Sequence, residues 1–113
     1  MLAGGWWIEP DSNIPNGESL VRQGLYGQRY FRSRFGRQCR TGYCVDTFGH
    51  PATLPKLLAG CGLEGYVFMR PQQHENPAIP HLAFRWRGDD GTEVIAIRIP
   101  RSYGIWSPAY LER

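Results

Sequence analysis

Thr41-Gly-Tyr-Cys-Val-Asp-Thr-Phe-Gly-His50 is the stretch that decides the fold. Residues 41–46 favour a short strand that ends at Asp46, and a Phe48-Gly49 turn follows at once. In parallel α/β sheets, active sites form beyond the carboxyl ends of the strands. The stretch therefore predicts an α/β protein that presents the Asp46 carboxylate at the mouth of its sheet.

A helix is predicted before this strand. Asn16 can cap it, Glu18 suits the positive end of the helix dipole, and Gly36 can end it in the left-handed conformation. One face of the helix follows the helical period. That face comprises Leu20, Gly24, Gln28, Phe31 and Phe35, with Val21 and Leu25 beside it.

A second helix and a third strand are predicted after Asp46. Thr53 can cap a helix that runs to Cys61, with Pro55 near its start, where a missing N–H does least harm. The run at 66–69 is unbroken and apolar, as expected of a strand covered on both faces. A first strand is predicted at 4–8. The order strand, helix, strand, helix, strand predicts parallel pairing through helical crossovers.

The C-terminal part predicts a β-hairpin. A polar loop spans 72–80, and two strand-like segments, 82–87 and 92–99, then flank Gly-Asp-Asp-Gly at 88–91. The residues at 101–113 show no clear period.

Composition narrows the class of protein. The chain has 113 residues, enough for one domain at most, and a net charge of only +3. Arginines gather between Arg22 and Arg40, but no nucleic-acid motif accompanies them, so a solvated helix face is the preferred interpretation. No apolar run is long enough to span a bilayer, and the N-terminus does not resemble a signal peptide. The three cysteines, an odd number without zinc-finger spacing, favour reduced thiols in a cytoplasmic protein.

Charged side chains follow each predicted parallel strand. Glu9 and Asp11 follow the first, Asp46 ends the second and Arg70 ends the third. Because parallel strands end at one edge of a sheet, these four groups are expected to converge there. Arg70 can orient the Asp46 carboxylate, although a structural ion pair at a strand end is an equal alternative. Asp11 can instead make an Asx turn.

The motifs in this order resemble the N-terminal catalytic region of the class II α-mannosidases, glycoside hydrolase family 38. They are Gly-Gly-Trp-Trp-Ile-Glu-Pro-Asp at 4–11, Asn-Ile-Pro-Asn-Gly-Glu-Ser-Leu-Val-Arg-Gln at 13–23, Leu-Tyr-Gly-Gln-Arg-Tyr-Phe at 25–31, the Val-Asp-Thr-Phe-Gly-His run at 45–50, and Phe-Met-Arg-Pro at 68–71. The resemblance runs from about residue 4 to about residue 100. It implies that residues 1–113 are a fragment of a seven-stranded β/α barrel: a βαβαβ parallel unit followed by a hairpin.

The resemblance also implies roles for individual residues. Asp46 matches the family's nucleophile, which is also a ligand of the catalytic zinc, and Arg70 matches an arginine that lines the sugar site. Trp6 or Trp7 can stack on a sugar, although a buried core tryptophan is the stronger alternative. Asp11 falls in the same motif and is a candidate substrate contact. His50 is more often structural than a ligand.

The implied function is that of a segment of a retaining, metal-dependent α-mannosidase that hydrolyses terminal α-mannosides. The remaining zinc ligands and the acid/base carboxylate of the family lie outside the matched motifs. We therefore expect the chain alone to bind no zinc tightly and to be inactive. A non-catalytic carbohydrate-binding module or pseudo-enzyme is the alternative. Expected partners are α-mannosides or oligosaccharides, with no nucleic acid or membrane, and a homo-oligomeric parent is left open.

Overall fold

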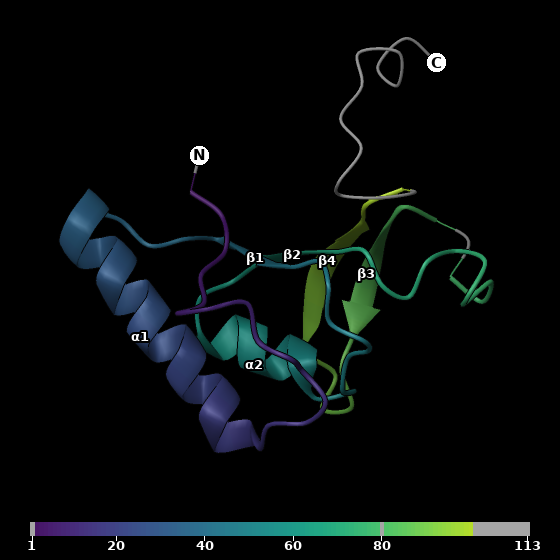
Figure 1. The fold of residues 1–113 in the computed structure, drawn as a ribbon, viewed down its shortest axis with the longest axis horizontal. Coiled ribbons are helices and arrows are strands. Elements are labelled where there is room, and N and C mark those ends of the chain that lie inside the picture. The colour runs from purple at the N-terminus through teal and green to yellow at the C-terminus, as the bar shows by residue number, and fades with distance from the viewer. Residues whose placement is uncertain (1, 80, 101–113) are drawn as a thin grey trace, which may run out of the picture.

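The computed structural model describes residues 2–79 and 81–100 (Figure 1). The elements, in chain order, are α1 (Gly17–Phe35), β1 (Thr41–Cys44), α2 (Leu54–Gly60), β2 (Gly65–Phe68), β3 (Ala83–Arg87) and β4 (Glu93–Arg98). This is the mixed α/β fold that the sequence predicts. The segment 101–113, for which the sequence shows no period, lies outside the described residues.

The four strands form one sheet in the order β1-β2-β4-β3. β1 and β2 are parallel, with Cys44 opposite Phe68, and β2 and β4 are also parallel. β3 and β4 pair antiparallel, which confirms the predicted hairpin. The sequence did not predict that β4 would insert between β2 and β3, so that the hairpin extends the parallel unit into one sheet.

The strand predicted at 4–8 was wrong in extent. Only Gly4 pairs with β1, through an isolated parallel bridge to Gly42. Gly4 and Gly5 have φ values of 114° and 72°, which are incompatible with a continuing strand. The chain therefore turns after the bridge, and the N–H of Trp7 donates to the carbonyl of Gln23 on α1 at 2.9 Å.

Both helices begin and end close to the predicted positions. The Asn16 side chain accepts a hydrogen bond from the N–H of Ser19 at 2.9 Å, and Gly36 ends α1 in the left-handed conformation with φ 69°. Thr53 stands at the N-cap of α2, but its side chain makes no capping hydrogen bond. Phe35, predicted on the packed face of α1, is exposed, because the last turn of the helix extends beyond its neighbours.

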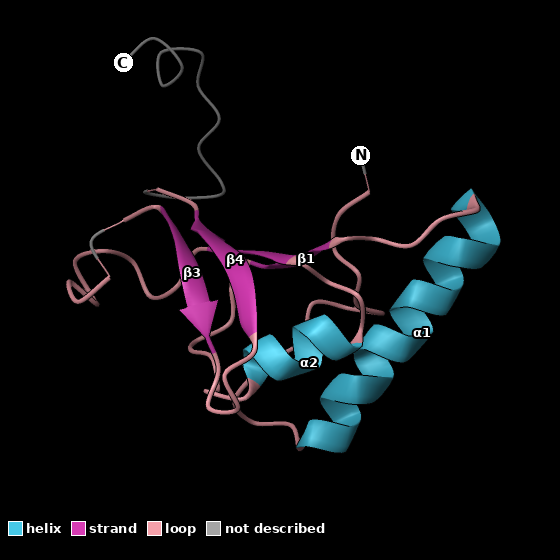
Figure 2. Ribbon diagram, turned by 180° about the vertical axis from the view of Figure 1, so that it is seen from behind, coloured by secondary structure: helices cyan, strands magenta, loops and turns pink. Residues whose placement is uncertain are grey.

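The core lies between α2 and one face of the sheet (Figures 1 and 2). Its buried residues are Trp6, Cys39, Cys44, Leu54, Leu58, Leu63, Tyr66, Phe68, Val94 and Ala96. α1 is joined to it by Gln28, whose side chain donates to the carbonyls of Cys39 and Cys61 and accepts from the N–H of Cys39, each at 2.9 Å.

The opposite face of the sheet carries exposed apolar side chains. Tyr43, Ile95 and Ile97 are 37%, 47% and 44% exposed. Within residues 2–79 and 81–100, neither helix combines the length and apolar character needed to cross a membrane.

Candidate active site

An ion pair between Asp46 and Arg70 lies at the carboxyl edge of the sheet. Asp46 follows β1, Arg70 follows β2, and these strands are parallel neighbours. The Nε of Arg70 donates to the Oδ1 of Asp46 at 3.0 Å, which confirms the predicted proximity. The side chains are 36% and 50% exposed, so the pair contributes little to stability. Its consequence is orientation: the carboxylate is fixed by one oxygen and remains open to solvent.

Phe48 also packs against Arg70. The guanidinium carbon lies 4.9 Å from the centroid of the Phe48 ring, a cation–π arrangement. Phe48 itself is 75% exposed. The peptide bond between Arg70 and Pro71 is cis. The Phe-Gly turn after Asp46 therefore presents an aromatic ring to the cation that holds Asp46.

Glu9 holds the backbone at Asp46. Its Oε1 accepts hydrogen bonds from the N–H groups of Val45 and Asp46, the second at 2.9 Å. The sequence placed Glu9 near this edge but could not assign its role, because a bond from a side chain to a distant backbone leaves no residue pattern. The structure thus brings together three of the four predicted charged groups: Glu9, Asp46 and Arg70.

Asp11, the fourth charged group, makes the alternative Asx turn. Its Oδ1 accepts from the N–H groups of Asn13 and Ile14 at 2.9 and 3.1 Å. The neighbouring Ser12, which the sequence did not single out, reaches the turn after Asp46. Its Oγ donates to the carbonyl of Gly49 at 2.8 Å, and its N–H donates to the Oγ1 of Thr47 at 3.1 Å.

The two tryptophans differ in their exposure to solvent. Trp6, one of the predicted substrate contacts, is only 6% exposed and belongs to the core, so its ring is not available to a sugar. This corrects the substrate-binding expectation and matches the core alternative. Trp7 is 58% exposed, and its ring packs edge-to-face on Tyr30 of α1 at 5.7 Å.

The half-buried His50 contacts the residues behind the ion pair. Its Nε2 lies 2.8 Å from the carbonyl oxygen of Arg70, and its Nδ1 lies 3.2 Å from the hydroxyl of Tyr66. Burial lowers the pKa of His50 below its ordinary value, so the ring is neutral near pH 7. The expectation of a structural histidine agrees with these contacts.

The described residues do not form a metal cage. No group of three or more His, Cys, Asp or Glu side chains that could hold a metal ion occurs among them. Catalytic zinc takes three protein ligands. Asp46 is the one predicted ligand present at this edge. The three cysteines are free, and burial raises the pKa of the Cys44 thiol to about 12, so that thiol stays protonated at neutral pH.

Comparisons with known proteins agree on one family. The family model of the glycosyl hydrolases family 38 N-terminal domain matches residues 1–110. Alpha-mannosidase G of Dictyostelium discoideum is 41% identical over 92 residues, which cover 81% of this chain and 8% of that protein. Alpha-mannosidase 2C1 of Mus musculus is 40% identical over 103 residues, which cover 90% of this chain and 10% of that protein.

A solved structure has the same fold. An alpha-mannosidase from Enterococcus faecalis superposes with a TM-score of 0.70 at 23% sequence identity, over 85% of this chain and 11% of that one. The chain thus spans about a tenth of the length of the curated relatives it matches. On the match of the family model and the identity of these relatives, the chain belongs to the glycosyl hydrolase family 38 N-terminal domain family.

Proposed function

We propose that this chain carries the nucleophile strand of a retaining α-mannosidase, with Asp46 as the nucleophile. The observation that supports it is the half-exposed Asp46 carboxylate, held by Arg70 through one oxygen at the carboxyl edge of parallel strands. The curated relatives are named as mannosidases, which supports terminal α-mannosides as the substrate class.

The chemistry proposed for Asp46 is double displacement at the anomeric carbon. A carboxylate oxygen of Asp46 attacks that carbon and forms a glycosyl ester, while the bond to the leaving oxygen breaks and a second carboxyl group protonates that oxygen. Water, deprotonated by the same second group, then attacks the anomeric carbon, and the bond between that carbon and the Asp46 oxygen breaks to release mannose and the Asp46 carboxylate. Arg70 and Glu9 fix the carboxylate and its backbone, so that the attacking oxygen is aimed before substrate arrives.

We propose that this chain supplies only one ligand to a catalytic divalent metal, expected as zinc. Asp46 would supply one oxygen ligand, and the described residues form no group of three or more ligands that could hold the ion. A bound metal would supply Lewis acidity and hold sugar hydroxyls. The other ligands and the second carboxyl group would come from other parts of a longer enzyme, so we propose that this chain alone does not turn over mannosides. A cytoplasmic location is the companion proposal, supported by the free cysteines.

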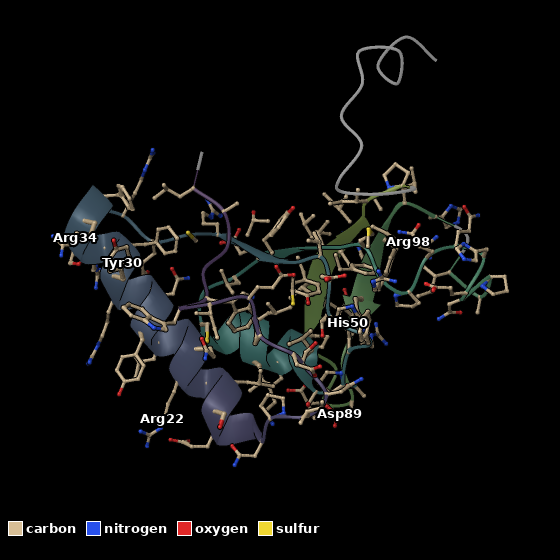
Figure 3. All side chains as sticks on the ribbon, in the orientation of Figure 1. Arg22, Tyr30, Arg34, His50, Asp89 and Arg98 are labelled. Atoms are coloured by element: carbon tan, nitrogen blue, oxygen red, sulfur yellow. The ribbon has the colours of Figure 1, made fainter. Side chains whose placement is uncertain are left out.

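The test is a set of variants in a longer enzyme that contains this segment. Asp46→Asn keeps the size of the side chain but removes the nucleophile, and we expect kcat on an aryl α-mannoside to fall by about 10⁴-fold. Arg70→Met should lower kcat by about 10- to 100-fold through lost orientation. Asp89→Asn, in the exposed hairpin turn, is the control (Figure 3). Wild-type turnover by Asp46→Asn would contradict the proposal.

A further inference from the structure

One imidazole joins three loops at the carboxyl edge of the sheet. His50 belongs to the turn after β1, and its Nε2 contacts the Arg70 carbonyl oxygen after β2 at 2.8 Å. Its Nδ1 lies 3.2 Å from the Tyr66 hydroxyl and 3.4 Å from the Oγ of Ser12 in the N-terminal segment. Figure 3 shows the half-buried His50 among other side chains near the middle of the view, whereas Arg22 extends outward from α1.

The partners of His50 determine its tautomer. A backbone carbonyl can only accept, so Nε2 carries the proton and donates it to Arg70. Nδ1 is then an acceptor. The Ser12 hydroxyl donates to the Gly49 carbonyl at 2.8 Å, which leaves the Tyr66 hydroxyl as the donor to Nδ1. Both ring nitrogens are thus used in the neutral form.

Three aromatic rings fix the plane of this imidazole. Tyr66, Phe68 and Trp86 meet it edge-to-face, with centroid separations of 5.4, 5.1 and 5.7 Å. The ring cannot turn without breaking both hydrogen bonds and displacing a packed neighbour. The direction in which Nε2 points at Arg70 is therefore set by the core.

We infer that His50 is a positioning residue that holds Arg70 against Asp46. Arg70 is tied at two points, through its carbonyl to His50 and through its Nε to Asp46. Loss of the first tie frees the backbone after β2 and lets the guanidinium shift relative to the carboxylate. The inference rests on the proposed function where it concerns turnover, but the geometry of the ion pair can be measured without any activity.

The titratable groups around His50 would not stabilise a positive charge on its ring, which favours the neutral imidazole. Burial raises the pKa of the Tyr66 phenol on β2 and of the Cys44 thiol on β1, so both stay neutral. Glu9 lies near these two groups, but its Oε1 already accepts hydrogen bonds from two backbone N–H groups. Trp86 of β3 carries no charge. The Arg70 guanidinium is cationic and would oppose a second positive charge.

Two near-isosteric substitutions separate the role of each nitrogen. Gln at position 50 places an amide N–H where Nε2 stands, and Asn places its polar group nearer to Nδ1. In a longer enzyme with this segment, His50→Asn should lower kcat about 10- to 100-fold with KM within about twofold, whereas His50→Gln should keep kcat within about threefold. Tyr66→Phe, which removes the donor to Nδ1 but keeps the bond from Nε2 to Arg70, should lower kcat by a smaller factor.

Crystal structures of the same variants give the readout that needs no turnover. We expect Arg70 Nε to stay about 3 Å from Asp46 Oδ1 in His50→Gln and to move out of hydrogen-bond range in His50→Asn. An intact ion pair in His50→Asn, or equal kcat losses in the Gln and Asn variants, would overturn the inference. If the pair opens as expected while wild type hydrolyses no mannoside, the positioning role stands and the proposed function fails. Should His50→Asn not fold, a Tyr66→Phe enzyme with unchanged kcat and an unchanged pair would overturn it instead.

Discussion

At the scale of single residues, two direct contacts fix Asp46, and a third holds one of its partners. Glu9 accepts from its N–H, Arg70 donates to its carboxylate, and His50 holds the carbonyl of Arg70. The sequence predicted Asp46 and Arg70 because each follows a recognisable strand. The roles of Glu9, Ser12 and His50 could not be predicted, because each depends on a hydrogen bond between segments that are distant in the chain.

Glu9 offers a prediction at this scale. Glu9→Ala removes the acceptor of two backbone N–H groups next to Asp46, and we expect kcat of a longer enzyme to fall by about 10-fold with little change in fold. Glu9→Gln keeps an acceptor oxygen and should lose less. Glu64→Gln, which breaks an exposed ion pair with Arg40, is the matched control. Equal kcat values for all three variants and wild type would refute a role for Glu9 in placing Asp46.

The pH dependence of stability should carry the signature of His50. Burial lowers its folded pKa below the ordinary 6.5, so between these two values the unfolded chain binds more protons. The free energy of unfolding should therefore fall as pH drops below about 6.5 and level off below the folded pKa. Above about pH 6.5, His50 should add no pH dependence to the free energy of unfolding. Urea titrations of wild type and His50→Gln between pH 5 and 8 provide the measurement. The wild-type slope should exceed that of the variant, and identical slopes would argue against a half-buried, neutral His50.

At the scale of elements, the pattern of the chain was sufficient for the helices, the parallel strands β1 and β2, and the hairpin. Caps such as Asn16 and Gly36 act locally, so their positions were predictable. The strand at 4–8 failed because its apolar residues suited a strand, while Gly4 and Gly5 adopt left-handed φ values that turn the chain into the core. The insertion of β4 beside β2 is a long-range pairing, which local pattern does not encode.

Packing of α1 on the N-terminal segment depends on glycine. A Cβ at Gly27 would overlap the backbone of Gly5 and Trp6, whereas one at Gly60 of α2 would meet nothing within 4 Å. We expect Gly27→Ala to destabilise the chain by about 1–3 kcal/mol. Gly60→Ala should be neutral or stabilising by up to about 1 kcal/mol, because alanine is the better helix former. Urea unfolding followed by circular dichroism compares them, and a Gly27→Ala chain as stable as Gly60→Ala would exclude this contact.

At the scale of the whole molecule, residues 2–79 and 81–100 cover only one face of the sheet. α2 packs on the face that holds Tyr66 and Ala96, whereas Ile95 and Ile97 remain nearly half exposed on the other. A chain that spans about a tenth of its relatives' length is expected to meet other structure there in a longer enzyme. The resemblance to one family was readable from ordered motifs, but this uncovered face appears only once the strands are assembled.

The open face predicts self-association of the isolated chain. Contiguous exposed apolar surface and unpaired strand edges favour contacts between copies. Sedimentation of the purified 113-residue chain should detect species heavier than the monomer, and the double variant Ile95→Thr, Ile97→Thr should reduce them. Ile14→Thr, at a residue 85% exposed away from the sheet, is the control. A wild-type chain that stays monomeric throughout the concentration series would contradict this prediction.

The central claim, that Asp46 is the nucleophile of an α-mannosidase, is tested most directly by trapping its glycosyl ester. A longer enzyme that contains this segment is incubated with a fluorinated mannosyl fluoride, which forms the ester faster than water removes it, and the labelled peptide is sequenced by mass spectrometry. The account predicts one mannosyl adduct, on Asp46, and none in Asp46→Asn. An adduct on a different carboxylate, with Asp46 unmodified, would contradict it.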